Sequence, residues 1–381
     1  MRRMKIPQQK EEYTMKIGCV KEIKPQEYRV GMTPGNVHDF AAHGHIVMIE
    51  AHAGEGSGFS DEAYRAAGAL IAATAQEVWA QADMIVKVKE PLEAEYPLMR
   101  DGQILYTYLH LAANRTLTEA MMQSGCIGVA YETIEDTHGG LPLLKPMSEI
   151  AGRLSIQEGA KYLEKPFGGK GVLLGGVTGV KGARVIILGA WIVGANACKM
   201  AVGLGADVTV MDVDLDKLRA LDALYSGRIK TLYSTPSAIH AEVRTADLVI
   251  GGVLIAGASA PKLVKREYLK DMIPGSVIVD VAVDQGGCFE TTKATYHNDP
   301  VYEVDGIVHY CVANMPGAVP RTSTLALTNA THAYGLKIAD QGIEALIQTD
   351  PLFRKGVNIY RGACSYDKVA QQFGLNCKVL G

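Results

Sequence analysis

Short apolar runs alternate with amphipathic stretches through the first third of the chain. The apolar runs predict strands at Lys16–Val20, His45–Glu50, Met84–Val88 and Gln103–Tyr106. The amphipathic stretches between them predict helices, among them Pro34–Ala42, Asp61–Ala67 and Thr116–Ser124. Strands that alternate with helices are typical of a parallel sheet covered by helices, so we expect an α/β domain here.

The same alternation returns after a predicted helix, Ser148–Glu164, and a glycine-rich connection, Gly168–Gly179. The second set of apolar runs predicts strands at Val185–Leu188, Val208–Met211, Asp247–Val253 and Ser276–Asp280. Later the chain enters a helix-like run, Ser323–Gly335, that continues to about Thr349. A helix in this place would return the chain to the first domain and make that domain discontinuous.

The length of 381 residues exceeds the size at which one hydrophobic core keeps growing, so two domains are expected. The predicted fold class is α/β, with two Rossmann-like domains whose parallel sheets are flanked by helices and separated by a cleft. One domain is expected to combine residues 15–142 with 321–381, and the other to span 143–320. The first 14 residues are basic in part but lack the apolar core of a signal peptide, and we expect a disordered extension there.

The stretch Ala183–Asp212 nearly matches a dinucleotide-binding βαβ fingerprint. Gly189 fits the tight turn after the first strand, and Gly194 allows close packing of helix on strand. The middle position is Trp191, where glycine normally lets the backbone approach a pyrophosphate. Asp212 ends the second strand roughly 20 residues on, where a carboxylate binds the adenosine ribose and repels a 2′-phosphate, which favours NAD over NADP.

The composition indicates which kinds of ligand the protein binds. A formal net charge of -3 gives no electrostatic reason to expect nucleic acid or an anionic membrane, so small molecules are the expected ligands. No apolar run reaches the length of a membrane-spanning helix. The seven cysteines have no CxxC spacing, which favours reduced thiols over disulfides or structural zinc, and predicts a cytoplasmic protein without a metal site.

Four side chains of the first domain follow predicted strands or precede a helix, where α/β ligands bind. Lys87 and Lys89 alternate onto the same side after one strand, so either could hold a carboxylate or be merely solvated. His110 follows the next strand and is the histidine best placed for proton exchange, although a structural role is equally open. Arg29 has a planar fork that could grip a carboxylate in two places.

In the second domain Asp280 and Asp284 close a predicted strand and enter a Gly286-Gly287 loop. They are candidates for holding a cofactor, a water or a histidine, with structural capping as the alternative. The sequence contains no HExxH, GxSxG or Walker A motif, so zinc proteolysis, serine hydrolysis and P-loop phosphoryl transfer lack support.

Together these stretches closely resemble the bacterial NAD-dependent L-alanine dehydrogenase family, which is related to transhydrogenase and saccharopine dehydrogenase. The resemblance spans essentially Met15 to the C-terminus. It is carried by KEIKPQEYRVGMTP, KVKEP, YLHLA, PLLKPMSEIAGRLS, VDVAVDQGGCFE and CVANMPGAVPRTST, in this order. Several long motifs in the right order make the resemblance specific.

The resemblance implies a role for each candidate. Arg29 and Lys89 would bind the substrate carboxylate, His110 would exchange a proton with the substrate oxygen, and Asp284 would assist acid-base work. Residues 143–320 would form the NAD-binding domain and the discontinuous domain would hold the substrate. The implied NAD site consists of Ser148, Gly189, Ile192, Val193, Gly194, Asp212, Lys217, Ser234, Val253, Leu254, Val281, Lys293, Val312, Asn314 and Met315.

The implied chemistry is hydride transfer from the α-carbon of alanine to the nicotinamide, followed by attack of water on the iminium and release of pyruvate and ammonia. A histidine is useful because protons move on and off oxygen at successive steps, and paired cations favour an anionic 2-oxo acid. The family also implies a homo-oligomer, usually a hexamer.

Two positions depart from the family pattern. Trp191 replaces the middle glycine of GxGxxG, and Lys293 stands where arginine is common, which keeps the charge but loses the fork. The indole of Trp191 could swing away from the phosphate path, occupy it, or stack on a shifted cofactor. We expect weakened NAD binding on a preserved fold. The alternative is a non-catalytic homologue, a binding or assembly protein that no longer turns over NAD.

Overall fold

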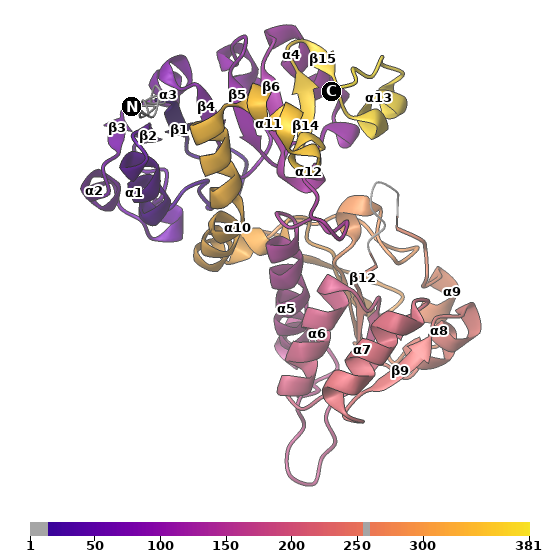
Figure 1. The fold of residues 1–381 in the computed structure, drawn as a ribbon. Coiled ribbons are helices and arrows are strands. Elements are labelled where there is room, and N and C mark those ends of the chain that lie inside the picture. Colours follow the sequence, from indigo (N-terminus) through magenta and orange to yellow (C-terminus); the bar gives the residue numbers. More distant parts are fainter. Residues whose placement is uncertain (1–13, 254–259) are drawn as a thin grey trace, which may run out of the picture. The chain divides into compact units, whose positions relative to one another are not determined.

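The computed structural model describes residues 14–253 and 260–381. The extension expected at residues 1–14 lies, except for Thr14, outside the described residues, and so does the predicted cofactor residue Leu254. The chain divides into two compact units, Met1–Leu144 with Val319–Gly381, and Lys145–Ala318. Each contains its own sheet with helices around it, which confirms the prediction of two α/β domains (Figure 1).

The first unit is built on a sheet in the order β15-β14-β6-β5-β4-β1-β2-β3. Its strands are β1 Lys16–Cys19, β2 Ile46–Glu50, β3 Leu70–Ala72, β4 Met84–Val86, β5 Ile104–Thr107, β6 Ile127–Ala130, β14 Val357–Tyr360 and β15 Ala363–Cys364. Its helices are α1 Pro34–Ala42, α2 Asp61–Ala66, α3 Ala75–Gln81, α4 Arg115–Ser124, α10 Pro320–Gln341, α11 Ile343–Thr349, α12 Pro351–Arg354 and α13 Asp367–Phe373. Strands β1 to β6 are parallel, whereas β14 and β15 add an antiparallel edge.

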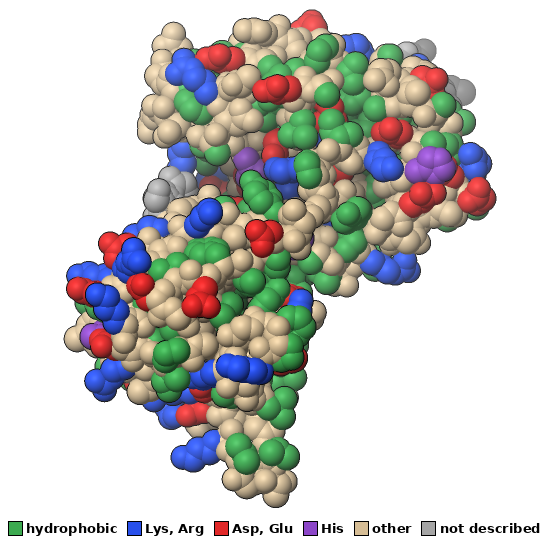
Figure 2. Space-filling model, turned by 180° about the vertical axis from the view of Figure 1, so that it is seen from behind, with side chains coloured by type: hydrophobic (Ala, Val, Ile, Leu, Met, Phe, Trp, Pro, Cys, Tyr) green, Lys and Arg blue, Asp and Glu red, His purple; other side chains and the backbone are tan. Residues whose placement is uncertain are grey.

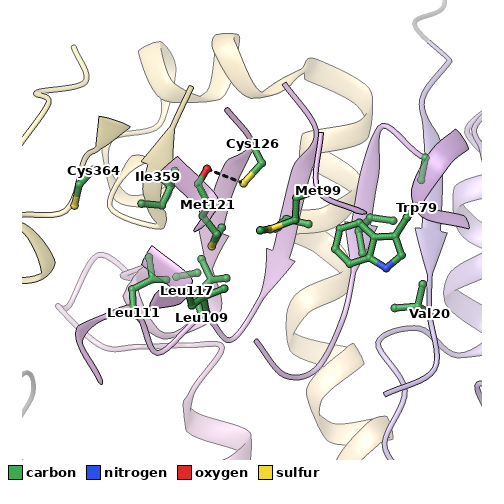
Figure 3. Packing of buried hydrophobic residues seen from close by; sticks show 14 of the residues in the cluster. Val20, Trp79, Met99, Leu109, Leu111, Leu117, Met121, Cys126, Ile359 and Cys364 are labelled. Atoms are coloured by element: carbon green, nitrogen blue, oxygen red, sulfur yellow. Dashed lines mark hydrogen bonds between the residues drawn. The ribbon is translucent and has the colours of Figure 1, made fainter. Parts of the chain in front are cut away.

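One hydrophobic cluster joins the two ends of the chain within this unit. Trp79 of α3, Met121 of α4 and Ile359 of β14 are all buried in it, as Figure 3 shows. The yellow C-terminal segment in Figure 1 therefore belongs to the same core as the indigo N-terminal strands. Burial of this shared apolar surface is what holds the discontinuous unit together.

The second unit has a sheet in the order β12-β13-β11-β10-β7-β8-β9. Its strands are β7 Arg184–Leu188, β8 Asp207–Asp212, β9 Lys230–Tyr233, β10 Leu248–Gly251, β11 Val277–Asp280, β12 Val301–Val304 and β13 Ile307–Tyr310. Its helices are α5 Lys145–Tyr162, α6 Ile192–Gly203, α7 Leu215–Tyr225, α8 Pro236–Val243 and α9 Arg266–Leu269. All pairings are parallel except that of β12 with β13, which are joined by the tight turn Asp305-Gly306.

In both sheets the order in which strands are added reverses once, in the same way. In the first unit the chain builds outward from β1 to β3, then returns to add β4 beside β1; in the second it builds from β7 to β9 and returns to add β10 beside β7. This is the doubly wound arrangement, in which ligands bind where the strand order reverses, beyond the carboxyl ends of the strands.

The sequence patterns missed some elements. Strand β3 lies at the edge of its sheet and has no fully buried residue, and β6 contains Gly128, so neither gives a clear apolar run. The single helix expected from Ser323 to about Thr349 is broken, because Gly342 has a positive φ of 80° and separates α10 from α11. The sheets are mostly parallel, as predicted, and each has an antiparallel pairing at one edge. No helix in the described ranges is long and apolar enough to cross a membrane.

Helix α6 approaches the sheet of the second unit at Gly194. A Cβ added there would collide with the carbonyl oxygen of Gly189, and α5, which packs beside α6 (Figure 1), uses Gly152 in the same way against the carbonyl of Val193. Glycine is therefore required at these points for the backbones to touch.

Replacement of Gly194 by alanine is expected to lower the free energy of unfolding by about 1–3 kcal/mol, because the methyl group must push helix from strand. Gly203, at the other end of α6, has no atom within 4 Å of an added Cβ. Gly203→Ala is therefore the matched control, expected to leave stability unchanged or raise it by up to about 1 kcal/mol. Thermal unfolding followed by circular dichroism measures both; equal midpoints for the two variants would contradict the close-approach argument.

Candidate active site

The parallel strands β1, β4 and β5 of the first unit end at one edge of the sheet, and the loops that follow them carry the predicted substrate residues. Arg29 follows β1, Lys89 follows β4 and His110 follows β5. Since β4 pairs with both β1 and β5, the structure brings these three loops to neighbouring positions. This edge lies at the reversal point of the strand order, where binding sites of α/β proteins form.

Arg29 is buried, with 2% of its surface exposed, and forms a close ion pair with Glu27. Its Nε donates to Oε1 of Glu27 at 2.6 Å and its Nη2 to Oε2 at 2.5 Å. The backbone N–H of Arg29 also donates to Oε1, at 3.1 Å. The guanidinium group is thus fixed in orientation, because the edge formed by Nε and Nη2 binds Glu27.

Lys87 does not accompany Lys89 as a cation available to ligands. It is 1% exposed, and its Nζ lies 3.2 Å from Oε2 of Glu22 and 2.8 Å from Oε1 of Glu95. Burial alone would lower the pKa of Lys87, but the two carboxylates outweigh it and raise that pKa. The interpretation of Lys87 as a solvated side chain or a ligand of the substrate carboxylate was wrong, because it is buried and two internal carboxylates neutralise its charge.

Lys89 is partly buried beside this ion triad. Its backbone N–H donates to Oε1 of Glu22 at 3.1 Å, and its carbonyl accepts the hydroxyl of Thr107 at 3.0 Å. Burial, and then the positive charge of Arg29, lower the pKa of the Lys89 ammonium. A cation that is poorly solvated and repelled by a neighbouring cation is stabilised when an anion binds, so Lys89 is suited to hold a carboxylate.

His110 is exposed and lies at the end of this edge. It precedes the 3-10 turn Leu111–Ala113 and has a left-handed backbone with φ 49°. Its ring stacks on Tyr108, with centroids 5.8 Å apart and planes at 18°. Its backbone N–H donates to Oε1 of Glu132 at 2.6 Å.

A carboxylate accepts the backbone N–H of each of the three predicted substrate residues. Glu27 binds that of Arg29, Glu22 that of Lys89 and Glu132 that of His110. Sequence reasoning missed all three glutamates, because only the folded chain shows which exposed or buried carboxylate meets which N–H group.

In the second unit Gly189 forms the turn at the carboxyl end of β7. Its φ is 102°, and an added Cβ would lie 2.9 Å from the carbonyl oxygen of Gly252, beyond the neighbouring strand β10. Only glycine fits such a turn without strain. The turn lies where the strand order reverses, as expected for a dinucleotide site.

Trp191 immediately precedes α6, with φ -89° and ψ -152°. This extended backbone is open to any residue, so the tryptophan causes no strain at this position. Its side chain is 41% exposed, and Nζ of Lys217 lies 5.5 Å from the ring centroid. The same ammonium lies 3.2 Å from Oδ2 of Asp214. The predicted cofactor residue Lys217 is therefore engaged by a cation–π contact and an ion pair.

Asp212 ties the end of β8 to the glycine turn. Its Oδ2 accepts the N–H of Ala190 at 2.6 Å and its Oδ1 that of Asp214 at 2.8 Å. Its carbonyl accepts the N–H of Ser234, the residue directly after β9, at 3.0 Å. The carboxylate thus lies at the edge where a ribose would bind, but it also supports the turn itself.

The remaining predicted cofactor residues mostly follow the same edge. Val253 comes after β10 and Val281 directly after β11, while Val312, Asn314 and Met315 come after β13. Ile192 and Val193 begin α6, Ser148 lies in the first turn of α5, and Lys293 is exposed on the connection before β12.

Asp280 and Asp284 differ in role. Asp280 is fully buried, and its carboxylate accepts N–H groups of Ala282 and Cys288 at 3.1 and 2.9 Å and a hydroxyl of Thr292. Burial raises its pKa. Asp280 is therefore the structural cap of the loop, as the alternative had it, whereas Asp284 is exposed on a 3-10 turn, Val283–Gln285.

Three features of the second unit fit a dinucleotide site, and one does not. Gly189 and Gly194 provide the tight turn and the close helix, and Asp212 lies at the end of the second strand. The exception is the indole at position 191, a bulky group at the helix N-terminus where phosphate oxygens normally bind.

The chain is similar to known proteins over almost its whole length. Residues 18–151 match the model for the family "Alanine dehydrogenase/PNT, N-terminal domain" and residues 155–367 that for "Alanine dehydrogenase/PNT, C-terminal domain". The chain is 53% identical to alanine dehydrogenase of Halomonas elongata and 50% identical to that of Mycobacterium tuberculosis, in each case over 95% of this chain and 97% of the relative.

Solved structures of the same family are similar to this chain as well. A structure titled L-alanine dehydrogenase matches with a TM-score of 0.92 and 52% identity, covering 94% of this chain and 99% of the other. A transhydrogenase from Sinorhizobium meliloti matches with a TM-score of 0.79 and 26% identity, covering 92% and 99%.

Removal of the Lys87 charge tests the buried triad. Lys87→Met leaves Glu22 and Glu95 buried without a cation, and is expected to lower the free energy of unfolding by about 3–5 kcal/mol. Lys355→Met, which breaks the more exposed pair of Lys355 with Glu135, is the control and is expected to cost at most about 1 kcal/mol. Denaturant unfolding measures both, and similar losses for the two variants would contradict the assignment.

Proposed function

Because the chain belongs to the alanine dehydrogenase/PNT family, we propose that it is an NAD-dependent L-alanine dehydrogenase, which converts L-alanine reversibly to pyruvate and ammonia. The observation that carries the proposal is near-complete coverage, at 53% identity, of a relative with that name. The cations and histidine gathered at one sheet edge of the first unit fit a small anionic substrate.

NAD, when bound, supplies the acceptor for the hydride of the substrate α-carbon. Gly189, Gly194 and Asp212 would hold it, together with the predicted residues of the neighbouring strand ends. The carboxylate of Asp212 disfavours a 2′-phosphate, which supports NAD over NADP.

The chain's own residues would bind and protonate the substrate. Arg29 and Lys89 would hold its carboxylate and fix its α-carbon in place. His110 would exchange a proton with the substrate oxygen as water adds and ammonia leaves. Asp284 would assist the same acid-base work.

The activity test is NADH formation from L-alanine and NAD at alkaline pH. The chain is expected to form NADH, and His110→Gln to lower kcat by about 10²–10⁴-fold because the proton acceptor is lost. His138→Gln, at an exposed histidine of a loop in the same unit, is the control and is expected to keep full activity. No NADH with L-alanine from the folded chain would contradict the proposal.

Trp191 favours a second candidate, a homologue that binds ligands or partners but no longer turns over NAD. We propose the intermediate case, an enzyme whose NAD affinity is reduced. The extended backbone and exposed indole support a preserved turn, and the engagement of Lys217 by the indole and by Asp214 supports weaker cofactor binding.

Titration of NADH fluorescence tests this effect. Trp191→Gly is expected to lower the dissociation constant about tenfold, which corresponds to ~1.4 kcal/mol. Trp191→Ala removes the same indole while keeping a Cβ that the extended backbone accepts, so it is expected to recover most of the gain. Equal dissociation constants for the unaltered chain and Trp191→Gly would refute weakened binding.

We also propose a cytoplasmic homo-oligomer, in line with the family's usual hexamer. Figure 2 shows hydrophobic side chains at the lower end of the second unit. On the loop that connects α5 to β7, Leu173, Val177 and Val180 are each more than half exposed. Apolar side chains gathered on one projecting loop favour contact with another protein surface. A monomer mass by light scattering would contradict the oligomer.

A further inference from the structure

His110 is held in a conformation that a histidine rarely adopts. Its φ of 49° and ψ of 34° lie in the left-handed region, which costs a residue with a Cβ about 1–2 kcal/mol. Such a conformation persists only where the surrounding structure imposes it. The groups that impose it here also determine where the imidazole lies.

The two neighbours of His110 in the chain are fixed in the core. Leu109 and Leu111 are both buried in the hydrophobic cluster of the first unit, and Figure 3 shows them beside Leu117. The backbone therefore enters and leaves His110 at fixed points. Apolar burial fixes these positions, but it leaves the orientation of the peptide groups between them to hydrogen bonding.

Glu132 supplies those hydrogen bonds. Its Oε1 and Oε2 accept the N–H of Leu109 at 3.1 and 3.2 Å, and Oε1 accepts the N–H of His110 at 2.6 Å. Two successive N–H groups that converge on one anion form a backbone nest, a geometry that a carboxylate stabilises. Glu132 reaches this nest because it follows β6, the parallel neighbour of β5.

Glu132 differs from the other two glutamates of this edge. Glu22 and Glu27 also pair with cationic side chains, Lys87 and Arg29. Among the described residues, Glu132 accepts hydrogen bonds from the backbone N–H groups of Leu109 and His110. Its effect on the site therefore passes through the position of His110.

We propose that Glu132 is a positioning residue for His110: its carboxylate holds the backbone nest that orients the imidazole toward the substrate oxygen. This inference rests on the proposed function, in which His110 exchanges that proton. Removal of the carboxylate leaves two N–H groups without their acceptor and releases the left-handed conformation.

The kinetic test compares Glu132→Ala and Glu132→Gln in the full-length protein. Glu132→Ala is expected to lower kcat by about 10–100-fold, since small displacements of a catalytic group have effects of this size. The KM for pyruvate is expected to change by less than about threefold, because Arg29 and Lys89 are untouched. Glu132→Gln keeps an oxygen acceptor and is expected to restore most of kcat.

Glu135→Gln is the matched control, three residues further along the same segment. Glu135 pairs with Lys355 and has no part in the site, so this variant is expected to keep full activity. An unchanged kcat in folded Glu132→Ala would overturn the proposal, and so would a loss confined to KM.

A double-mutant cycle separates positioning from a general structural role. In the His110→Gln background, Glu132→Ala is expected to lower the residual kcat by less than about twofold, because its target is gone. A further 10–100-fold loss in that background would show that Glu132 acts independently and would overturn the proposal.

The proposal is also decided if the chain has no alanine dehydrogenase activity. A crystal structure of Glu132→Ala is then the readout. A φ at His110 that has left the left-handed region supports the positioning role, whereas an unchanged positive φ overturns it.

Discussion

Parallel pairing of β1, β4, β5 and β6 is the constraint on which the site of the first unit depends. The loops that follow parallel strands all lie at one edge of the sheet. Residues far apart in the sequence therefore become neighbours at that edge. Charged groups crowded onto this edge then need partners. The glutamates that follow β1 bind cationic side chains and backbone N–H groups, and Glu132, which follows β6, binds backbone N–H groups.

Much of this arrangement is predictable from sequence. The alternation of apolar runs gave both α/β domains, and a candidate that directly follows a strand is placed at the carboxyl edge by strand polarity alone. His110 and Asp212 were located in this way, and β8 does end at Asp212. The return of the chain to the first unit was predicted from the helix-like run that begins at Ser323, and in the structure β14 pairs with β6 of that unit.

The pairing of polar groups could not be predicted from the sequence. Lys87 and Lys89 look alike in an alternating pattern, yet one is neutralised by two buried carboxylates and the other lies next to Arg29. Asp280 and Asp284 were equally similar, and only the first caps a loop. Trp191 was visible as a departure, but its extended backbone and its contact with Lys217 depend on where α7 packs.

Isotope transfer is the most direct test of the central claim, that this chain moves a hydride between an amino acid and a nicotinamide. L-alanine carrying deuterium on its α-carbon is incubated with NAD and the protein, and the products are examined by proton NMR. Deuterium at C4 of the reduced nicotinamide, with none released to water, is the predicted result. Deuterium lost to water without reduction of the nicotinamide, or no reaction of the folded protein, would contradict the account.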